Sequence, residues 1–405
     1  MIIVKKNSVQ KIIFNITLSL LIFSCLDPYD TNIKGYENLL VVDALITDEN
    51  RSHYVLLSRT IPDLNQEPQR VANAWVSITD ENFNETILRE TSPGIYATDS
   101  TKFRAQVGKT YTLKISTPEG KTYISNPCTM LPSGNIEKIY YNKDKGWNND
   151  NTYESEGISV YIDGSAQESE YARWSFEEDW KFQVFCAPDF SFDTDGNIVH
   201  INNDKIYCWK SALSTDITLH SFKNHGNNTI NKKKIHFIPT SKTDRISLRY
   251  SILVKQLSIS KEEYEFWDKL QKSTEDVGDI LGKQPFSIAG NMNNIDDKTE
   301  PVLGYFQVSS TSQKRLYIEN SDLSKLDVPF YSHKSCKIDT VLIDNNRYTS
   351  IYDIYLQEVA TGRYGMYDVY YPEMSMTPTG LLLTQPTCCD CTLTGTNKKP
   401  DFWQD

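Results

Sequence analysis

Apolar and polar residues alternate in short runs through the part of the chain that follows residue 36. The runs "YVLLSR" at Tyr54–Arg59 and "TYTLKIST" at Thr110–Thr117 are rich in β-branched and aromatic residues, a pattern typical of strands with one buried face. The sequence "PEGK" separates two such runs, and its Gly120 can take the positive φ that a tight hairpin needs. Residues 36–132 are therefore predicted to form an immunoglobulin-like β-sandwich of about seven strands.

The remaining residues, 133–405, continue in strand-like runs, with one segment of helical periodicity. Ser260 and Glu263 form a capping box, and apolar residues then recur at helical spacing at Tyr264, Phe266, Trp267 and Leu270. This pattern predicts a helix over 261–281 whose aromatic face packs against a sheet rather than serving as a ligand platform. The pair Asp195–Gly196 favours a hairpin turn over a calcium loop. The predicted fold class is mainly β, a sandwich followed by a larger β-rich domain with at least one packed helix and a Cys-rich C-terminal tail.

The first 24 residues have the pattern of an export signal. Three lysines precede the apolar run "IIFNITLSLLIF", which is too short for a membrane-spanning helix. The sequence Ile22–Cys25 resembles a bacterial lipobox, in which the cysteine is lipidated and becomes the mature N-terminus. We therefore expect a lipoprotein signal peptide at 1–24, lipidation of Cys25, and a lipid-anchored linker at 25–35; the alternative is a plain secretory signal with an incidental cysteine. Acidic residues at Asp27 and Asp30 resemble the surface-export signal of Bacteroidota lipoproteins, which implies an outer-membrane protein facing the cell exterior.

Seven cysteines remain after Cys25 is set aside, and in an exported protein they are expected to form disulfides. Cys186 and Cys208 bracket a segment with the pattern of a hairpin, so we predict a bond between them. Cys336 is expected to bond one of the clustered cysteines, Cys388, Cys389 and Cys391. The odd number leaves at least one free thiol or an intermolecular bond, and the complete connectivity stays open. The alternative is a metal site formed by Cys388, Cys389, Asp390 and Cys391, although no second cysteine or histidine pair accompanies this cluster.

Several short motifs occur in an order that resembles a known family. They are "YCWKS" at 207–211, the "EEYEFW" helix, "AGNMNN" at 289–294, "VLGYFQVSS" at 302–310 and the ending "CCDCTLTGTNKKPDFW". Together they are similar to a domain-of-unknown-function family of Bacteroidota outer-membrane lipoproteins. Genes of that family commonly lie beside TonB-dependent outer-membrane transporters, and the resemblance therefore implies an accessory role in uptake without an established activity.

Charge and motif content narrow the class of function. The net charge of −11 argues against a nucleic-acid partner, because such binding depends on phosphate neutralisation by Lys and Arg. The sequence has no polybasic cluster, so attachment to a membrane is expected to come from the lipid. It also lacks His-Glu-x-x-His, Gly-x-Ser-x-Gly and Walker motifs. Glu177, Glu178 and Asp179 form the densest carboxylate group, which we interpret as a solvated strand edge or turn.

We therefore expect a non-enzymatic protein without a cofactor, acting as an accessory or ligand-capture partner of a TonB-dependent nutrient transporter. The alternatives are the metal-binding lipoprotein and a structural or adhesive surface protein. The ligand and its binding residues are not identified by any motif. Trp147 and Tyr153 are candidates for exposed aromatic contacts, whereas Trp209, next to Cys208, is expected to be part of the core.

Overall fold

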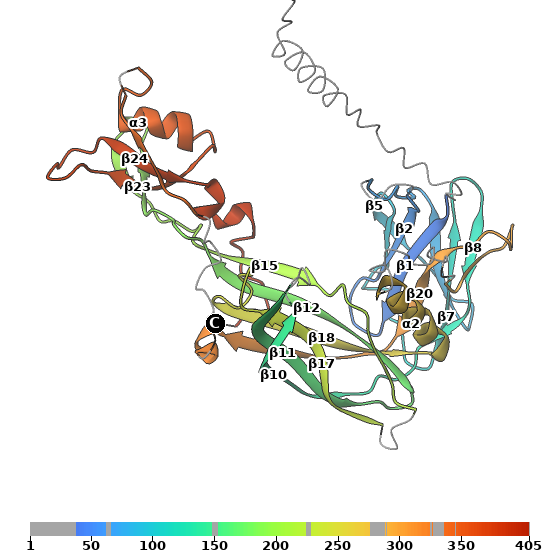
Figure 1. Ribbon diagram of the computed structural model, residues 1–405. Helices are drawn as coiled ribbons and strands as arrows, with labels where there is room; N and C mark the ends of the chain where they lie inside the picture. The colour runs from blue at the N-terminus through green and yellow to red at the C-terminus, as the bar shows by residue number, and fades with distance from the viewer. Residues whose placement is uncertain are drawn as a thin grey trace, which may run out of the picture.

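The computed structural model describes residues 38–61, 66–147, 153–223, 228–275, 288, 290–324, 326, 336–344 and 346–404. The predicted signal peptide, Cys25, the linker at 25–35 and the last residues of the predicted helix, 276–281, lie outside these ranges. The fold is mainly β, as predicted. Figure 1 shows three parts in a row, with a sandwich at one end, a two-sheet body in the middle and a smaller C-terminal unit at the other end. Within the described ranges, no helix has the length and apolar character needed to cross a membrane.

Two sheets pack face to face in the sandwich and enclose its hydrophobic core. The first sheet has the order β20-β1-β2-β6-β5, with β1 at Leu40–Thr47, β2 at Tyr54–Arg59, β5 at Arg89–Ser92, β6 at Ile95–Ala97 and β20 at Leu303–Ser309. The second has the order β19-β8-β7-β3-β4, with β9 also paired to β7, and comprises β3 at Trp75–Asp80, β4 at Glu85–Ile87, β7 at Thr110–Ser116, β8 at Thr122–Ser125, β9 at Cys128–Thr129 and β19 at Met292–Asn294.

Strand β7 shows how the alternating sequence produces this packing. Its Tyr111, Leu113 and Ile115 are buried, and the residues between them are partly exposed. The "PEGK" turn joins β7 to β8 as predicted, with a hydrogen bond from Thr117 N to Lys121 O of 2.9 Å. Gly120 has a φ of +85°, which an L side chain rarely adopts.

The sandwich is completed by strands that lie far away in the sequence. β20 pairs in parallel with β1, and β19 pairs with β8, so residues that the sequence analysis assigned to the second domain form part of the first. Phe306 and Val308 of β20 are buried in the sandwich core. At Gly304 an added Cβ would lie 1.9 Å from Val42 O, so only glycine allows the two strands to approach here. The domain boundary predicted at residue 132 therefore divides the sandwich: strands β1–β9 precede it, and β19 and β20, which complete the same sandwich, follow it.

The middle body also consists of two sheets with a hydrophobic core between them. One has the order β10-β11-β17, with β10 at Ile136–Trp147, β11 at Glu154–Ser165 and β17 at Thr229–Pro239. The other has the order β15-β12-β18-β21, with β16 also paired to β12, and comprises β12 at Tyr171–Gln183, β15 at Tyr207–Leu213, β16 at Thr218–Ser221, β18 at Arg249–Ile259 and β21 at Thr311–Glu319, followed by the 3₁₀-helix η2 at Asn320–Leu323.

The carboxylate group on β12 is not the solvated edge that was expected. Glu177 is partly exposed, but Glu178 and Asp179 are buried. Because β12 lies inside the sheet, its two neighbouring carboxylates point to opposite faces, and each has a cationic partner. Arg245 Nε lies 3.1 Å from Glu178 Oε1, and Arg315 Nη1 lies 3.3 Å from Asp179 Oδ2. The group therefore links β12 to β21 through Arg315 and to the segment between β17 and β18 through Arg245.

The C-terminal unit has its own small core. Its elements are the hairpin β13 at Phe190–Phe192 and β14 at Ile198–His200, the sheet of β22 at Asp339–Leu342, β24 at Gly380–Thr384 and β23 at Gly365–Tyr370, the short helix α3 at Ile351–Ile354 and the π-helix η3 at Tyr355–Val359. The turn between β13 and β14 is the predicted Asp-Gly turn. Asp193 Oδ1 accepts hydrogen bonds from the backbone of Asp195 and Asn197, and Gly196 has a φ of +82°.

Helix α2, at Lys261–Glu275, lies where the sandwich meets the body (Figure 1). Glu263 N donates to Ser260 Oγ at 3.2 Å, which is one half of the predicted capping box. The aromatic face packs as expected, because Phe266 lies 4.8 Å from Tyr305 of the sandwich, measured between ring centroids. Tyr264 lies 4.7 Å from Tyr171 of the body. The helix thus contacts both parts.

The carboxyl group of Glu263 is buried beneath this helix instead of completing the capping box. It accepts a hydrogen bond from Trp267 Nε1 at 3.3 Å. Burial raises its pKa to about 7, and the attraction of Arg173 only partly offsets this. Ionisation of Glu263 therefore disfavours the folded state.

The stability of the chain is expected to depend on pH through Glu263. Its pKa in the folded state is above the unfolded value, so its stabilising contribution is complete below about 4.5 and is lost as pH rises through about 7. Between pH 5 and pH 8 the wild type should lose stability relative to E263Q by on the order of 2 kcal/mol. Urea unfolding of both proteins at the two pH values measures this difference.

The matched control is E265Q, which changes a half-exposed glutamate on the same helix. This variant should differ from the wild type by the same amount at both pH values. A pH-independent difference between wild type and E263Q would contradict the assignment of the titration to Glu263.

Candidate functional site at the cysteine-rich junction

The three clustered cysteines form three long-range disulfides. They join Cys186 to Cys389, Cys208 to Cys391 and Cys336 to Cys388. Cys336 therefore bonds a member of the cluster, in line with the sequence analysis. The predicted Cys186–Cys208 bond is wrong.

The strand register explains why Cys186 and Cys208 do not meet. The hairpin that they bracket exists, but β12 and β15 pair Phe182 with Cys208, whereas Cys186 lies beyond the end of this ladder. Residues joined by a disulfide within a ladder must lie opposite each other, with Cα atoms about 4.4–6.8 Å apart. Each of the two cysteines instead meets the returning C-terminal segment.

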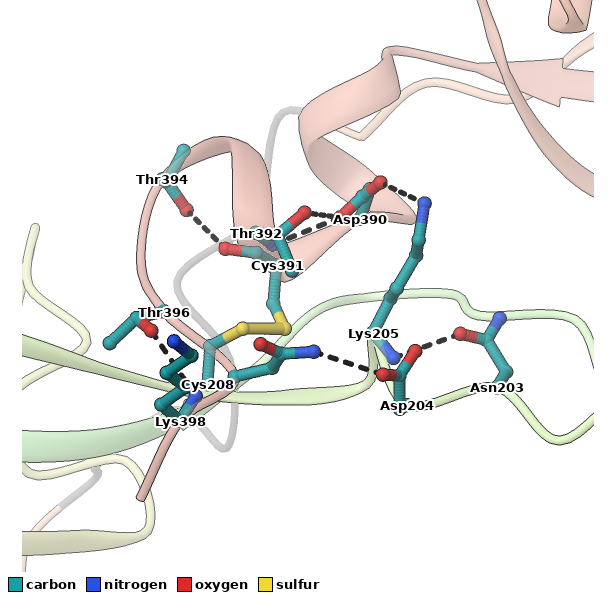
Figure 2. The surroundings of a disulfide bond; sticks show 11 residues. Asn203, Asp204, Lys205, Cys208, Asp390, Cys391, Thr392, Thr394, Thr396 and Lys398 are labelled. Atoms are coloured by element: carbon teal, nitrogen blue, oxygen red, sulfur yellow. Dashed lines mark hydrogen bonds and ion pairs between the residues drawn. A yellow bond between two sulfur atoms is a disulfide. The ribbon is translucent and has the colours of Figure 1, made fainter. Parts of the chain in front are cut away.

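The segment that carries the cluster runs through two short 3₁₀-helices, η4 at Pro386–Cys388 and η5 at Cys391–Leu393. Its backbone adds to the covalent links: Cys186 N donates to Cys388 O at 2.9 Å, and Cys391 N donates to Lys205 O at 3.0 Å. Figure 2 shows the Cys208–Cys391 bond with the polar groups around it. We call residues 386–391, with their three cysteine partners, the cysteine junction.

Asp390 lies between two of these disulfides and is paired. Lys205 Nζ donates to Asp390 Oδ2 at 2.7 Å, and Thr392 N donates to Oδ1 at 2.9 Å (Figure 2). Burial opposes the ionisation of Asp390, but the hydrogen bonds from Lys205 and Thr392 outweigh it, so the pKa of this carboxyl lies below its usual value.

The arrangement of the clustered cysteines differs from the one that the alternative metal site would need. In this oxidised chain each sulfur of Cys388, Cys389 and Cys391 is bonded to another sulfur, whereas a metal needs thiolates. Among the residues that the structure describes, no three His, Cys, Asp or Glu side chains converge as a metal site would require.

The tail after the cysteine junction is fixed to the body by backbone and ring contacts. Trp209 and Thr396 exchange two backbone hydrogen bonds, of 2.8 and 3.0 Å. Trp403 is buried and lies edge-on to Trp209 at 6.3 Å between ring centroids. Trp209 is thus part of the core, as predicted, while Trp147 and Tyr153 are exposed.

Cys128 is the free cysteine among the described residues. It lies on β9 of the sandwich, and its sulfur accepts a hydrogen bond from Asn291 Nδ2 at 3.2 Å. Burial, with a further contribution from Glu263, raises the pKa of this thiol to about 12. The thiol is therefore protonated at neutral pH and unreactive as a nucleophile.

Most of the chain matches a known protein family. Residues 26–315 match the family described as Domain of unknown function (DUF4249). The chain belongs to this family. No curated protein matches the sequence.

The cysteine junction crosses the end of the DUF4249 match. Cys186 and Cys208 lie inside the matched residues, and their partners Cys389 and Cys391 lie outside them. Two disulfides thus connect the DUF4249 region to the C-terminal segment. The sequence indicated these six cysteines and the bond from Cys336 to the cluster, but not the remaining pairing, because that depends on strand register and on the return of the chain.

Alkylation under denaturing conditions without reductant should modify Cys128 and leave the six junction cysteines linked. Peptide mapping by mass spectrometry is expected to recover the peptide that contains Cys388, Cys389 and Cys391 linked to the three peptides that contain Cys186, Cys208 and Cys336. Alkylation of native protein should leave Cys128 largely unmodified because its thiol is only partly exposed and is protonated. Recovery of a peptide in which Cys186 is linked to Cys208 would contradict the structure.

The Cys336–Cys388 bond should stabilise the chain more than the Cys208–Cys391 bond does. The sequence separations are 52 and 183 residues, but the intact Cys186–Cys389 bond reduces the ring that Cys208–Cys391 closes to about 24 residues, from Cys186 to Cys208 and from Cys389 to Cys391. Loss of a native disulfide typically costs about 2–5 kcal/mol, and the difference in ring length favours the Cys336–Cys388 bond by roughly 0.7 kcal/mol. Urea unfolding of the double variants C208A/C391A and C336A/C388A, each against the wild type, measures both values. Equal losses in the two variants would show that loop closure does not set their order.

Proposed function

We propose that the chain is an outer-membrane lipoprotein, anchored through Cys25 and facing the cell exterior, that acts as a non-catalytic accessory and ligand-capture partner of a TonB-dependent nutrient transporter. The export signal, the lipobox-like sequence and the resemblance to lipoproteins encoded beside such transporters support this proposal. Three disulfides fit an oxidising compartment outside the cytoplasm.

The observation that carries the proposal is an exposed apolar loop on the C-terminal unit. Tyr371 is half exposed, and Met374 and Met376 are fully exposed, in the connection between β23 and β24. Flexible methionines are frequent on surfaces that bind partners.

The position of this loop suits a membrane-anchored accessory. The described chain begins in the sandwich, and the C-terminal unit lies at the opposite end of the molecule (Figure 1). The chain from Cys25 to Asn38 can reach at most about 45 Å. A lipid on Cys25 would hold the sandwich close to the membrane and leave the far end free for a partner.

A tagged form of the chain should recover a TonB-dependent barrel in stoichiometric amount from detergent-solubilised outer membranes. The double variant M374S/M376S is expected to lower this recovery at least about tenfold, because it removes the apolar contacts of the loop. Mass spectrometry of the eluted proteins measures both results. Recovery of the lipoprotein alone would count against the transporter partnership.

Three further variants separate docking from anchoring. Phe83 is an equally exposed apolar residue on the turn between β3 and β4 of the sandwich, so F83S should leave recovery unchanged. C25A should abolish labelling by a radioactive fatty acid and release the chain from the membrane, whereas C128A should retain both the label and the attachment. Equal losses of partner in F83S and M374S/M376S would show that the loop is not the docking surface.

A further inference from the structure

A cavity of about 470 Å³ lies beside the cysteine junction. One wall comes from the hairpin β13–β14 and the chain that follows it, at residues 188–205. A second wall comes from another part of the C-terminal unit, at residues 355–366, and the third side is residues 386–393. Its volume is within the range of small-molecule sites, about 300–1,000 Å³.

Most of the cavity wall is apolar and aromatic. The residues that contribute these surfaces are Phe190, Ile201, Tyr355, Val359, Tyr364 and Met366. All are at least partly buried, and the rings come from both facing walls. Such a wall favours a flat apolar group of the ligand.

The polar side of the cavity carries one ion pair and one further carboxylate, Asp204, which is exposed and accepts a hydrogen bond from Asn397 Nδ2 at 3.0 Å. Lys205 and Asp390 both line it and form an ion pair of 2.7 Å (Figure 2). Asn203 lies beside them, and its side chain already contacts the backbone of Pro188 and Lys205. A ligand group that both accepts and donates hydrogen bonds can contact Lys205 and Asp390 together without separating the pair, whereas a single charge would match one partner and oppose the other.

The wall formed by the C-terminal unit has an unusual local structure. Tyr355 and Val359 are the first and last residues of the π-helix η3, and π-helical turns are frequent at functional sites. The same helix contains Glu358, which is buried and paired with Arg347 at 2.7 Å and with Arg363 at 3.2 Å. This ionic cluster holds the π-helical turn and thereby the two side chains that line the cavity.

We propose that this cavity binds a small molecule without net charge that has an apolar ring at one end and an amide or hydroxyl group at the other. The inference rests on the capture role proposed above for its biological setting. The binding itself belongs to the isolated chain and needs no transporter. Because Cys389 lines the cavity and is bonded to Cys186 on the facing segment, the site is complete only in the oxidised chain.

Binding can be measured on the full lipoprotein in lipid nanodiscs, with empty nanodiscs as the blank. Equilibrium dialysis would compare N-acetyl-phenylalaninamide, which is uncharged, with the anionic N-acetyl-phenylalanine and the cationic phenylalaninamide. The three compounds share one ring and differ at the polar end. The uncharged compound is expected to bind roughly tenfold more tightly than either charged one. Failure of all three to bind, or equal binding of all three, would overturn the proposal.

A pair of substitutions tests the location of the site. Leu393 is exposed and lines the cavity, whereas Leu356 is exposed on the π-helix and does not line it. L393W should fill the opening and weaken binding at least about tenfold, and L356W should leave binding unchanged. Equal effects of the two variants would place the bound compound elsewhere.

A third variant tests the polar end without filling the cavity. K205Q leaves the carboxylate of Asp390 without its cation, so the cationic compound should become the tightest of the three. An unchanged order of affinities would overturn the assigned role of the Lys205–Asp390 pair. Because binding is measured without any transporter, a negative result here and a negative pull-down remain separate findings.

Discussion

The arrangement of this chain depends on the covalent links at residues 386–391. Three neighbouring cysteines reach three different places: Cys186 just after β12, Cys208 on β15 and Cys336 before β22. The C-terminal unit has only a small hydrophobic core, and a core of that size stabilises a unit weakly by itself. Cross-links that close long loops restrict the unfolded chain most, so the junction stabilises the part of the molecule that most needs it.

Long-range connectivity recurs at the other end of the molecule. The sandwich is complete only when β20 pairs with β1 and β19 with β8, after the chain has passed through most of the middle body. Contacts between residues so far apart in sequence form slowly, because the chain loses the conformational entropy of loop closure before the contacts stabilise it. Both ends of the molecule therefore depend on segments that return late in the chain, and α2 packs at the place where the sandwich return begins.

Local sequence patterns predicted the local structure of the fold. Alternation located β7, the turn chemistry located the hairpins at Gly120 and Gly196, and the capping box located the start of α2. The same patterns contain no information about which distant segments meet, so the membership of β19 and β20 in the sandwich was missed. The burial of Glu178 was missed for a related reason, since its cationic partner Arg245 comes from a different part of the chain.

At the cysteine junction, local sequence patterns likewise could not predict which individual cysteines form disulfides with each other. Composition and the export signal indicated which cysteines form disulfides, but spacing suggested Cys186–Cys208 because both flank one hairpin. Register decides between partners, and it places Cys208 opposite Phe182. Local sequence patterns also could not predict the cavity, because its wall residues come from three separated segments that the disulfides bring together.

The covalent construction of the cavity bears on how it would bind a ligand. A site formed by three mobile segments would lose conformational freedom upon binding, and that loss reduces affinity. Here the Cys186–Cys389 bond, the Lys205–Asp390 pair and the ionic cluster around Glu358 fix the three walls before any ligand arrives. A preorganised cavity next to an exposed apolar loop is an arrangement in which a ligand can be held while a partner docks, since neither event requires the walls to rearrange.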